Sequence, residues 1–219
     1  VIRLIRSELP ADIPLIGFGG APFTLASYAI EGKGSRNYVH VKQMMYGDSG
    51  AWHGLMDKIT TAVIDYMQYQ IESGVQAVQL FDSWVGCLSP ADYEQYVFPH
   101  SSRLMEAISG KVPVIHFGTG NPALSSLMAK AGGDVIALDW RTPLTATWDE
   151  MGVKSVQGNM DPIVLCATPE AVKAQAKALL DEVDGRPGHI FNLGHGIIPE
   201  TPVENVKTLV DFVHEYSAR

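Results

Sequence analysis

The amino-acid sequence predicts an α/β fold built on a parallel sheet. Six apolar runs of strand length alternate with segments of helical periodicity along the 219 residues. Most of these runs are apolar on both faces, which is typical of parallel strands covered by helices on two sides. The predicted strands are Ile13–Phe18, Ala77–Phe81, Val112–Phe117, Asp134–Leu138, Lys154–Gln157 and Gly188–Asn192. Their alternation with helices implies right-handed crossover connections.

Start signals mark three of the intervening helices. Ser89-Pro90-Ala91-Asp92 supplies a hydroxyl N-cap, a proline at the first helical position and a carboxylate at the third. Thr201-Pro202-Val203-Glu204 repeats this pattern, and Thr168-Pro169-Glu170 shares most of it. We therefore expect a helix directly after each of the three hydroxyl residues.

The number of strands bears on the architecture. Six strands are two fewer than a closed (β/α)8 barrel needs. The chain begins at Val1, and Val1–Arg6 reads as the end of a helix whose start lies upstream. We expect the C-terminal portion of a longer barrel protein, with about six of eight βα units in one domain over residues 1–219, incomplete at its N-terminus. A six-stranded doubly wound sheet is the alternative.

Composition sets broad limits on location and partners. Cys87 and Cys166 lie far apart and form no close-spaced ligand motif, which fits a reducing compartment. No apolar stretch approaches the roughly 18 residues of a membrane span, and no signal-peptide core opens the chain, so we expect a cytoplasmic protein. A net charge of −8 argues against nucleic acid or an anionic membrane as partner. A small anionic substrate stays open, because it needs only a local group of cations.

Three short segments place polar groups after predicted strands. They are Gly17–Thr24, Leu80–Ser83 and Asn192–Gly196. In a parallel barrel such segments meet at one rim, where active sites are built. We expect the following residues near that rim: Gly20, Ser83, Gly118, Trp140, Met160 and His195.

The side chains of these segments suit polar recognition. Glycines flank His195, so the backbone there can approach a ligand closely while offering an imidazole that titrates near neutrality. A structural role for this histidine stays open on the residues alone. Ser83 and Tyr28 carry hydroxyls that can hydrogen-bond carboxylates. Neither is paired in sequence with a base, so nucleophilic catalysis is not supported.

Other patterns favour structural roles. Gly17-x-Gly19-Gly20 lacks the glycine spacing of a dinucleotide loop. His116 stands at a strand end where a metal ligand would be well placed, but Gly118 offers no donor atom. We therefore expect the His116 imidazole to bond backbone at the rim. Five further residues are expected at packing or surface positions: Tyr66, Met67, Tyr69, Gln70 and Cys87.

Five ordered motifs resemble the uroporphyrinogen decarboxylase family. Leu15–Leu25, with Tyr28 and Glu31–Gly34 following, looks like the second signature of that family. The other four agree in order: Gln79–Ser83, Leu138–Trp140, Gln157–Pro162 and Asn192–Gly196. The similarity runs through essentially the whole chain, whereas the N-terminal third of the family has no counterpart in it.

The resemblance implies a cytoplasmic, homodimeric (β/α)8 barrel that acts without cofactor or metal. Its reaction would convert the four acetate side chains of uroporphyrinogen III to methyl groups, giving coproporphyrinogen III in porphyrin (haem) biosynthesis. By similarity Tyr28, Ser83 and His195 match the family's active-site residues, with catalytic and substrate-binding roles. Lys33 and Arg141 are cations near the matched motifs, and Arg141 could bind a substrate carboxylate or form a surface salt bridge.

The resemblance also bears on the isolated chain. An arginine-rich signature and an aspartate that bind the substrate in this family have no counterpart in these 219 residues. We therefore expect the chain by itself to be inactive.

Two alternatives remain at this stage. Corrinoid-dependent methyltransferases resemble this family in fold, but they bind zinc through a His-x-Cys pair at the third strand end. The present chain has His116-Phe117-Gly118 there, so the soft sulfur ligand is replaced by no side chain. The second alternative is a non-catalytic barrel that binds a small molecule.

Overall fold

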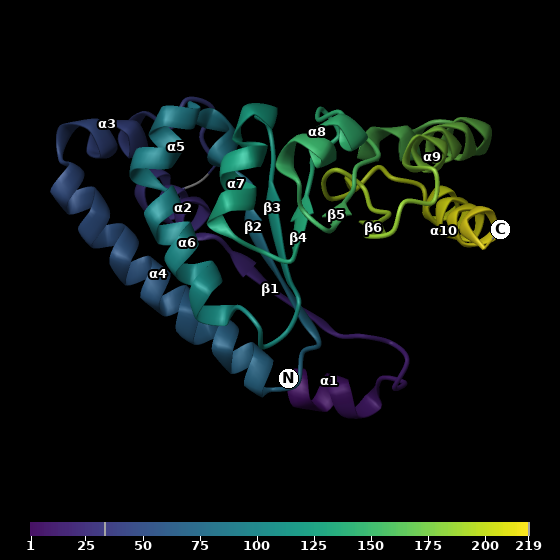
Figure 1. Ribbon diagram of the computed structural model, residues 1–219, viewed down its shortest axis with the longest axis horizontal. Helices are drawn as coiled ribbons and strands as arrows, with labels where there is room; N and C mark the ends of the chain where they lie inside the picture. Colours follow the sequence, from purple (N-terminus) through teal and green to yellow (C-terminus); the bar gives the residue numbers. More distant parts are fainter. Residues whose placement is uncertain (33, 219) are drawn as a thin grey trace. The chain divides into compact units, whose positions relative to one another are not determined.

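The structure is a computed structural model that describes residues 1–32 and 34–218 (Figure 1). Each predicted strand overlaps an observed one. The strands are Ile16–Gly20 (β1), Ala77–Asp82 (β2), Val114–Gly118 (β3), Val135–Ala137 (β4), Val156–Gln157 (β5) and His189–Ile190 (β6). Their order in the sheet is β1-β2-β3-β4-β5-β6. This sequential order is that of a barrel, and it makes the doubly wound alternative wrong, because doubly wound sheets reverse direction at a switch point.

Helices separate the strands as the α/β pattern predicts. They are Ile2–Glu8 (α1), Pro22–Glu31 (α2), Val39–Gly47 (α3), Ser49–Glu72 (α4), Pro90–Tyr96 (α5), Phe98–Ile108 (α6), Ser125–Ala131 (α7), Leu144–Met151 (α8), Pro169–Val183 (α9) and Val203–Ser217 (α10). The chain falls into two compact units, Val1–Ile136 and Ala137–Arg219. Among the helices in the described residues, none is both long and apolar enough to cross a membrane.

Two of the three expected helix caps are present. The Ser89 hydroxyl accepts a hydrogen bond from the Asp92 N–H at 3.1 Å, and the Thr168 hydroxyl accepts one from the Ala171 N–H at 3.3 Å. The prediction for Thr201 is wrong. Pro202 is extended (ψ 129°) and is itself the N-cap residue, so α10 begins one residue later than expected and the buried Thr201 hydroxyl caps nothing in the described residues.

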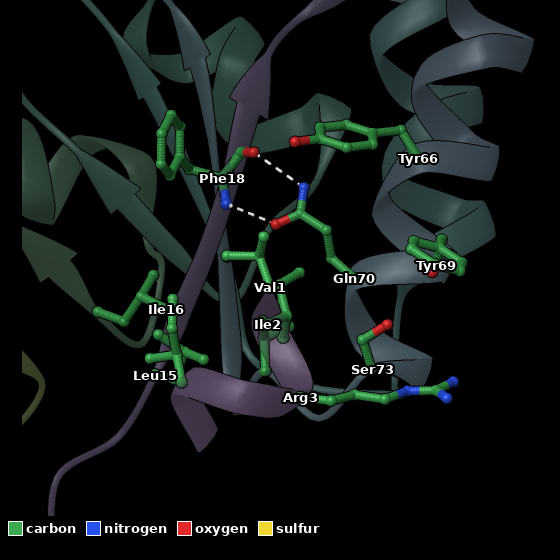
Figure 2. A pocket seen from close by; sticks show the side chains of 13 residues that line it. Val1, Ile2, Arg3, Leu15, Ile16, Phe18, Tyr66, Tyr69, Gln70 and Ser73 are labelled. Carbon is green, nitrogen blue, oxygen red and sulfur yellow. Dashed lines mark hydrogen bonds between the residues drawn. The ribbon is translucent and has the colours of Figure 1, made fainter. Parts of the chain in front are cut away.

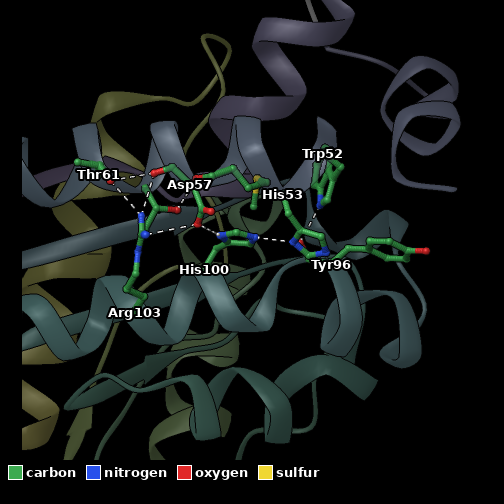
Figure 3. A network of polar contacts seen from close by, with 9 residues as sticks. Trp52, His53, Asp57, Thr61, Tyr96, His100 and Arg103 are labelled. Atoms are coloured by element: carbon green, nitrogen blue, oxygen red, sulfur yellow. Dashed lines mark hydrogen bonds and ion pairs between the residues drawn. The ribbon is translucent and has the colours of Figure 1, made fainter. Parts of the chain in front are cut away.

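The first unit contains two apolar cores. Helices α4 and α6 pack on β2 and β3 through buried residues such as Met67, Leu80 and Leu104. A second core, around Trp52, joins α2, α3, α4 and α5. Between α4 and α6 lies a chain of polar contacts that links Asp57, His100 and His53 (Figure 3).

The second unit contains a core of its own. Helices α9 and α10 enclose apolar side chains that include Leu165, Val172 and Leu209. The buried Asn205 amide donates to the carbonyls of Leu165 and Ala167, each at 2.8 Å, which satisfies two backbone groups at the end of a short 3-10 turn over Pro162–Cys166.

Candidate active site

The strand register aligns the first unit's predicted rim residues. β1 pairs with β2 so that Gly20 lies opposite Phe81, and β2 pairs with β3 so that Asp82 lies opposite Gly118. The carboxyl ends of these three parallel strands therefore form one edge. Ser83 follows β2 directly at that edge. The prediction that Gly20, Ser83 and Gly118 share a rim is confirmed within this unit.

Asp82 is a buried carboxyl group at this edge. It has no exposed surface, and its Oδ1 accepts a hydrogen bond from the Thr24 hydroxyl at 3.1 Å. Its Oδ2 has no hydrogen-bond partner among the described residues. Burial raises the pKa of Asp82 to about 7, although hydrogen bonds from Thr24 act in the opposite direction. A carboxyl group that titrates near neutrality at a strand end is a feature of functional sites.

Tyr28 and Ser83 are connected through Trp84. The Tyr28 ring meets the Trp84 ring edge-on, with centroids 5.8 Å apart and planes at 80°. Trp84 directly follows Ser83, and its backbone N–H donates to the Thr24 hydroxyl at 3.4 Å. Tyr28 is 46% exposed and Ser83 is partly exposed, so both can contact a ligand.

His195 is positioned in the second unit by backbone contacts around it. The Gly194 N–H donates to the Met160 carbonyl at 2.7 Å, and Met160 forms a parallel bridge with Leu193. The His195 ring then meets the Trp140 ring edge-on, with centroids 6.2 Å apart. Trp140, Met160 and His195 therefore lie together, as predicted, within this unit.

Arg141 also contacts the Trp140 ring. Its guanidinium carbon stands 3.8 Å from the centre of the Trp140 ring, and its Nη1 is 3.2 Å from Asp139 Oδ2. Asp139 is 2% exposed, and its Oδ1 also accepts the Arg141 backbone N–H at 2.8 Å. The salt bridge considered for Arg141 is thus present, while 51% of its side chain stays exposed. A half-exposed guanidinium can still contact an anion.

A buried asparagine supports this second group. The Asn159 amide donates to the carbonyls of Asp139 and Thr142, at 2.8 and 2.7 Å. The segment that carries Trp140 and Arg141 is therefore held to Asn159, which lies just after the end of β5. Lys33, the other cation expected near the motifs, lies outside the described residues.

The alternative metal site does not form around His116. The His116 ring is fully buried, and its Nδ1 bonds the Gly132 carbonyl at 3.2 Å, as predicted. Burial lowers the pKa of His116 to about 4. Within residues 1–32 and 34–218, no three His, Cys, Asp or Glu side chains are grouped as metal ligands.

The expected packing and surface roles are confirmed. Met67 is fully buried, whereas Tyr66 and Tyr69 are exposed. Cys87 is a partly buried free thiol that packs against the core around Trp52, and burial raises its pKa to about 11. Gln70 is buried, and both halves of its amide bond the backbone of Phe18, at 3.1 and 2.9 Å (Figure 2).

The cavity beside Gln70 is distinct from the group around Ser83. It has a volume of about 530 Å3 and lies between α1, β1 and α4 (Figure 2). Its lining includes Phe18, Tyr66 and Tyr69 but neither Tyr28 nor Ser83. The polar groups around Ser83 are therefore separate from this cavity.

Sequence reasoning left Thr24, Asp82 and Trp84 without roles, although all three lie in or beside the quoted motifs. The sequence signal that could have identified Asp82 was its position beside Ser83 at the end of a predicted strand. The bond that joins it to Thr24 spans 58 positions and has no local sequence signature.

A solved structure of another protein has a similar fold. A methyltransferase from Methanosarcina mazei superposes with a TM-score of 0.85 at 23% sequence identity, covering 98% of this chain and 62% of that protein. At this identity the likeness concerns the fold alone.

Sequence comparisons give the family. The family described as "Uroporphyrinogen decarboxylase (URO-D)" matches residues 1–216. A uroporphyrinogen decarboxylase from Carboxydothermus hydrogenoformans is 52% identical over 219 residues, covering 99% of this chain and 63% of the relative. One from Sorangium cellulosum is 53% identical over 215 residues, covering 97% of this chain and 62% of the relative. The chain thus spans somewhat less than two thirds of the length of these relatives, and it belongs to the uroporphyrinogen decarboxylase family.

Proposed function

We propose that the protein carrying this chain is a carboxy-lyase that decarboxylates the four acetate side chains of uroporphyrinogen III. The product is coproporphyrinogen III, an intermediate of porphyrin and haem biosynthesis. The observation that carries the proposal is the family match over residues 1–216, together with relatives of about 50% identity that are named uroporphyrinogen decarboxylase.

The chemistry needs no resident cofactor in this proposal. A pyrrole that is protonated at a ring carbon becomes an electron sink, and the electron pair left by the departing CO2 is delocalised into that ring. A proton then adds to the former acetate carbon to complete the methyl group, and the ring carbon releases the proton that it had gained, which restores the pyrrole. Each acetate thus consumes one proton and releases one CO2. The protein has to orient the acetate, transfer protons and place charge.

Four residues of this chain take these tasks. Tyr28 and Ser83 position the reacting acetate through their hydroxyls; the Tyr28 ring packs against Trp84, which directly follows Ser83. His195 binds a carboxylate or transfers a proton, and Arg141 binds a further carboxylate with the exposed part of its guanidinium. We propose that residues 1–219 form one barrel domain.

The remaining properties follow from family membership alone. We propose that the protein is a cytoplasmic homodimer, whose partners are its tetrapyrrole substrate and a second copy of itself. A separate argument concerns other partners: nucleic acid and anionic membrane surfaces are not expected, because the net charge of the chain is −8 and both carry negative charge.

The test is a direct assay of CO2 release. Purified protein carrying this sequence is incubated anaerobically with uroporphyrinogen III after treatment with a chelator, and both CO2 and porphyrinogen products are quantified. We expect one CO2 per acetate lost and accumulation of coproporphyrinogen. Activity that the chelator abolishes and zinc restores, or methyl transfer from a corrinoid, would favour the methyltransferase alternative. Tight binding of uroporphyrinogen without turnover would favour a non-catalytic barrel.

A further inference from the structure

The Thr24 hydroxyl contacts the residues on both sides of Ser83. It donates its proton to Asp82 Oδ1 at 3.1 Å and accepts the backbone N–H of Trp84 at 3.4 Å. Thr24 is 4% exposed and Asp82 is fully buried, so solvent does not compete for the bond to the carboxyl group. The three residues Asp82, Ser83 and Trp84 are therefore held to α2 by one side chain.

Thr24 and Tyr28 lie on the same helix, four residues apart. Side chains at this spacing lie above one another on one face of a helix. The hydroxyl of Thr24 and the ring of Tyr28 therefore both face the segment that follows β2, and the ring packs against Trp84. Thr24 and Tyr28 thus both contact Trp84, the residue that follows Ser83.

The side chain at position 24 is well suited to this task. The branched Cβ of threonine limits χ1 in a helix to two main rotamers, and the bonds to Asp82 and Trp84 select one of them. The start of α2 is further tied to β2, because the Ala21 N–H donates to the Phe81 carbonyl at 2.9 Å. The Thr24 hydroxyl therefore joins α2 to the end of β2, and a backbone hydrogen bond already holds these two elements together.

We propose that Thr24 is a positioning residue of this site: its hydroxyl holds Asp82 and Trp84, and thereby fixes the Ser83 hydroxyl relative to that of Tyr28. The catalytic part of this proposal rests on the function proposed above. Thr24 does not itself touch the substrate in this arrangement. Small displacements of positioning groups are costly, since a misplacement of about 1 Å can lower a rate on the order of 100-fold.

Three variants test the role of the hydroxyl. Thr24→Val keeps the shape of the side chain but loses both hydrogen bonds, and Thr24→Ser keeps the hydroxyl. Thr60→Val is the matched control, because Thr60 is also buried and its hydroxyl, among the described residues, bonds the Met56 carbonyl of its own helix at 2.7 Å. Each variant is assayed for kcat and KM with uroporphyrinogen and for its unfolding midpoint.

The expected pattern separates positioning from stability. Thr24→Val should lower kcat by about 10- to 100-fold with a change in KM of less than about threefold, and Thr24→Ser should restore most of kcat. Thr60→Val should leave kcat within about twofold of the wild type even if its unfolding midpoint falls. Wild-type kcat in Thr24→Val, or an equal loss in Thr60→Val, would overturn the proposal.

A second measurement does not depend on catalysis. Hydrogen exchange of the Trp84 amide should be at least about tenfold faster in Thr24→Val than in the wild type, because its acceptor is lost. Exchange in Thr60→Val should be unchanged at that amide. If the wild type releases no CO2 from uroporphyrinogen, the proposed function fails, and the exchange result alone decides whether Thr24 holds this segment. Unchanged exchange at Trp84 would overturn the positioning role in either case.

Discussion

Gly194 lies in direct contact with the backbone of Trp140. A Cβ atom at position 194 would stand 2.3 Å from the Trp140 nitrogen, which is far inside van der Waals contact. The same approach sets the His195 ring against the Trp140 ring. The absence of a side chain at Gly194 is therefore a geometric requirement for the position of His195.

The two glycines beside His195 should respond differently to alanine. Gly194→Ala should destabilise the protein by about 1–3 kcal/mol through overpacking and lower CO2 release at least about tenfold, because His195 is displaced. Gly196→Ala is the matched control, since a Cβ at position 196 meets nothing within 4 Å. Urea unfolding and CO2 assays check both variants. Equal effects at the two positions would contradict the steric argument.

The Tyr28 hydroxyl should matter more than its ring. Tyr28→Phe keeps the edge-on contact with Trp84 and removes only the hydroxyl proposed to orient the acetate. We expect kcat to fall by about 100-fold, because a reacting group misplaced by about 1 Å can lower a rate by that factor, with little change in thermal stability. Tyr69→Phe removes a hydroxyl from an exposed ring on α4 and should leave kcat unchanged. Steady-state kinetics distinguish the two outcomes.

The parts of the fold that depend on local pattern could be predicted from the sequence. Strand positions followed from apolar runs, and the edge shared by Gly20, Ser83 and Gly118 followed from glycine and polar residues at the strand ends. Boundaries were less accurate at β1, which begins three residues later than predicted, and at β5 and β6, which each contain two residues. The regular pairing of β5 with β6 stops after two residues, and the isolated Met160–Leu193 bridge lies beyond it.

The Thr24–Asp82 bond and the helix cap at Thr201 show why the rest could not be predicted. The bond joins residues 58 positions apart, and only the β1–β2 register brings them together. Thr201 carries the same local signal as Ser89, yet Pro202 adopts an extended conformation in this context. The local signal at Thr201 therefore located the helix, but its first residue lies one position later than the signal predicts.

The pKa of His100 should depend on Asp57. The His100 Nε2 lies 2.9 Å from His53 Nδ1, and its Nδ1 lies 3.3 Å from Asp57 Oδ1 (Figure 3). Burial lowers the pKa of His100, His53 and Arg103 lower it further, and Asp57 opposes them. Asp57→Asn removes the anion, so the pKa of His100 should fall further. NMR titration checks this, with the exposed Asp65→Asn on the same helix as control; an upward shift would contradict the argument.

Stability should fall as the pH drops from about 6.5 to 4, in part because of His116. The unfolded chain protonates this imidazole near its ordinary value of 6.5, whereas burial lowers the folded pKa to about 4. Protons therefore favour the unfolded chain in this window, and the loss at pH 4 is about 3 kcal/mol. His116→Gln should flatten the pH dependence of the unfolding free energy, and the exposed His40→Gln should not. A parallel pH curve for His116→Gln would contradict this assignment.

Arg141 and Arg186 form a natural comparison. Each guanidinium carbon lies 3.8 Å above a tryptophan ring, Trp140 and Trp148 respectively. Each also pairs with an aspartate, but the partner of Arg141 is the buried Asp139, whereas Arg186 pairs with the exposed Asp149. The two arginines thus make the same kinds of local contact. In the proposed function Arg141 binds the substrate and Arg186 does not.

Replacing each arginine by lysine isolates that difference. Lysine keeps the charge but loses the planar fork that binds a carboxylate through two parallel hydrogen bonds. We expect Arg141→Lys to raise the KM for uroporphyrinogen by about tenfold, with kcat within about threefold of the wild type, because a remote carboxylate is bound similarly before and during reaction. Arg186→Lys should change neither constant. If both variants raise KM equally, the effect comes from lost packing on tryptophan; if neither does, Arg141 serves only its salt bridge with Asp139.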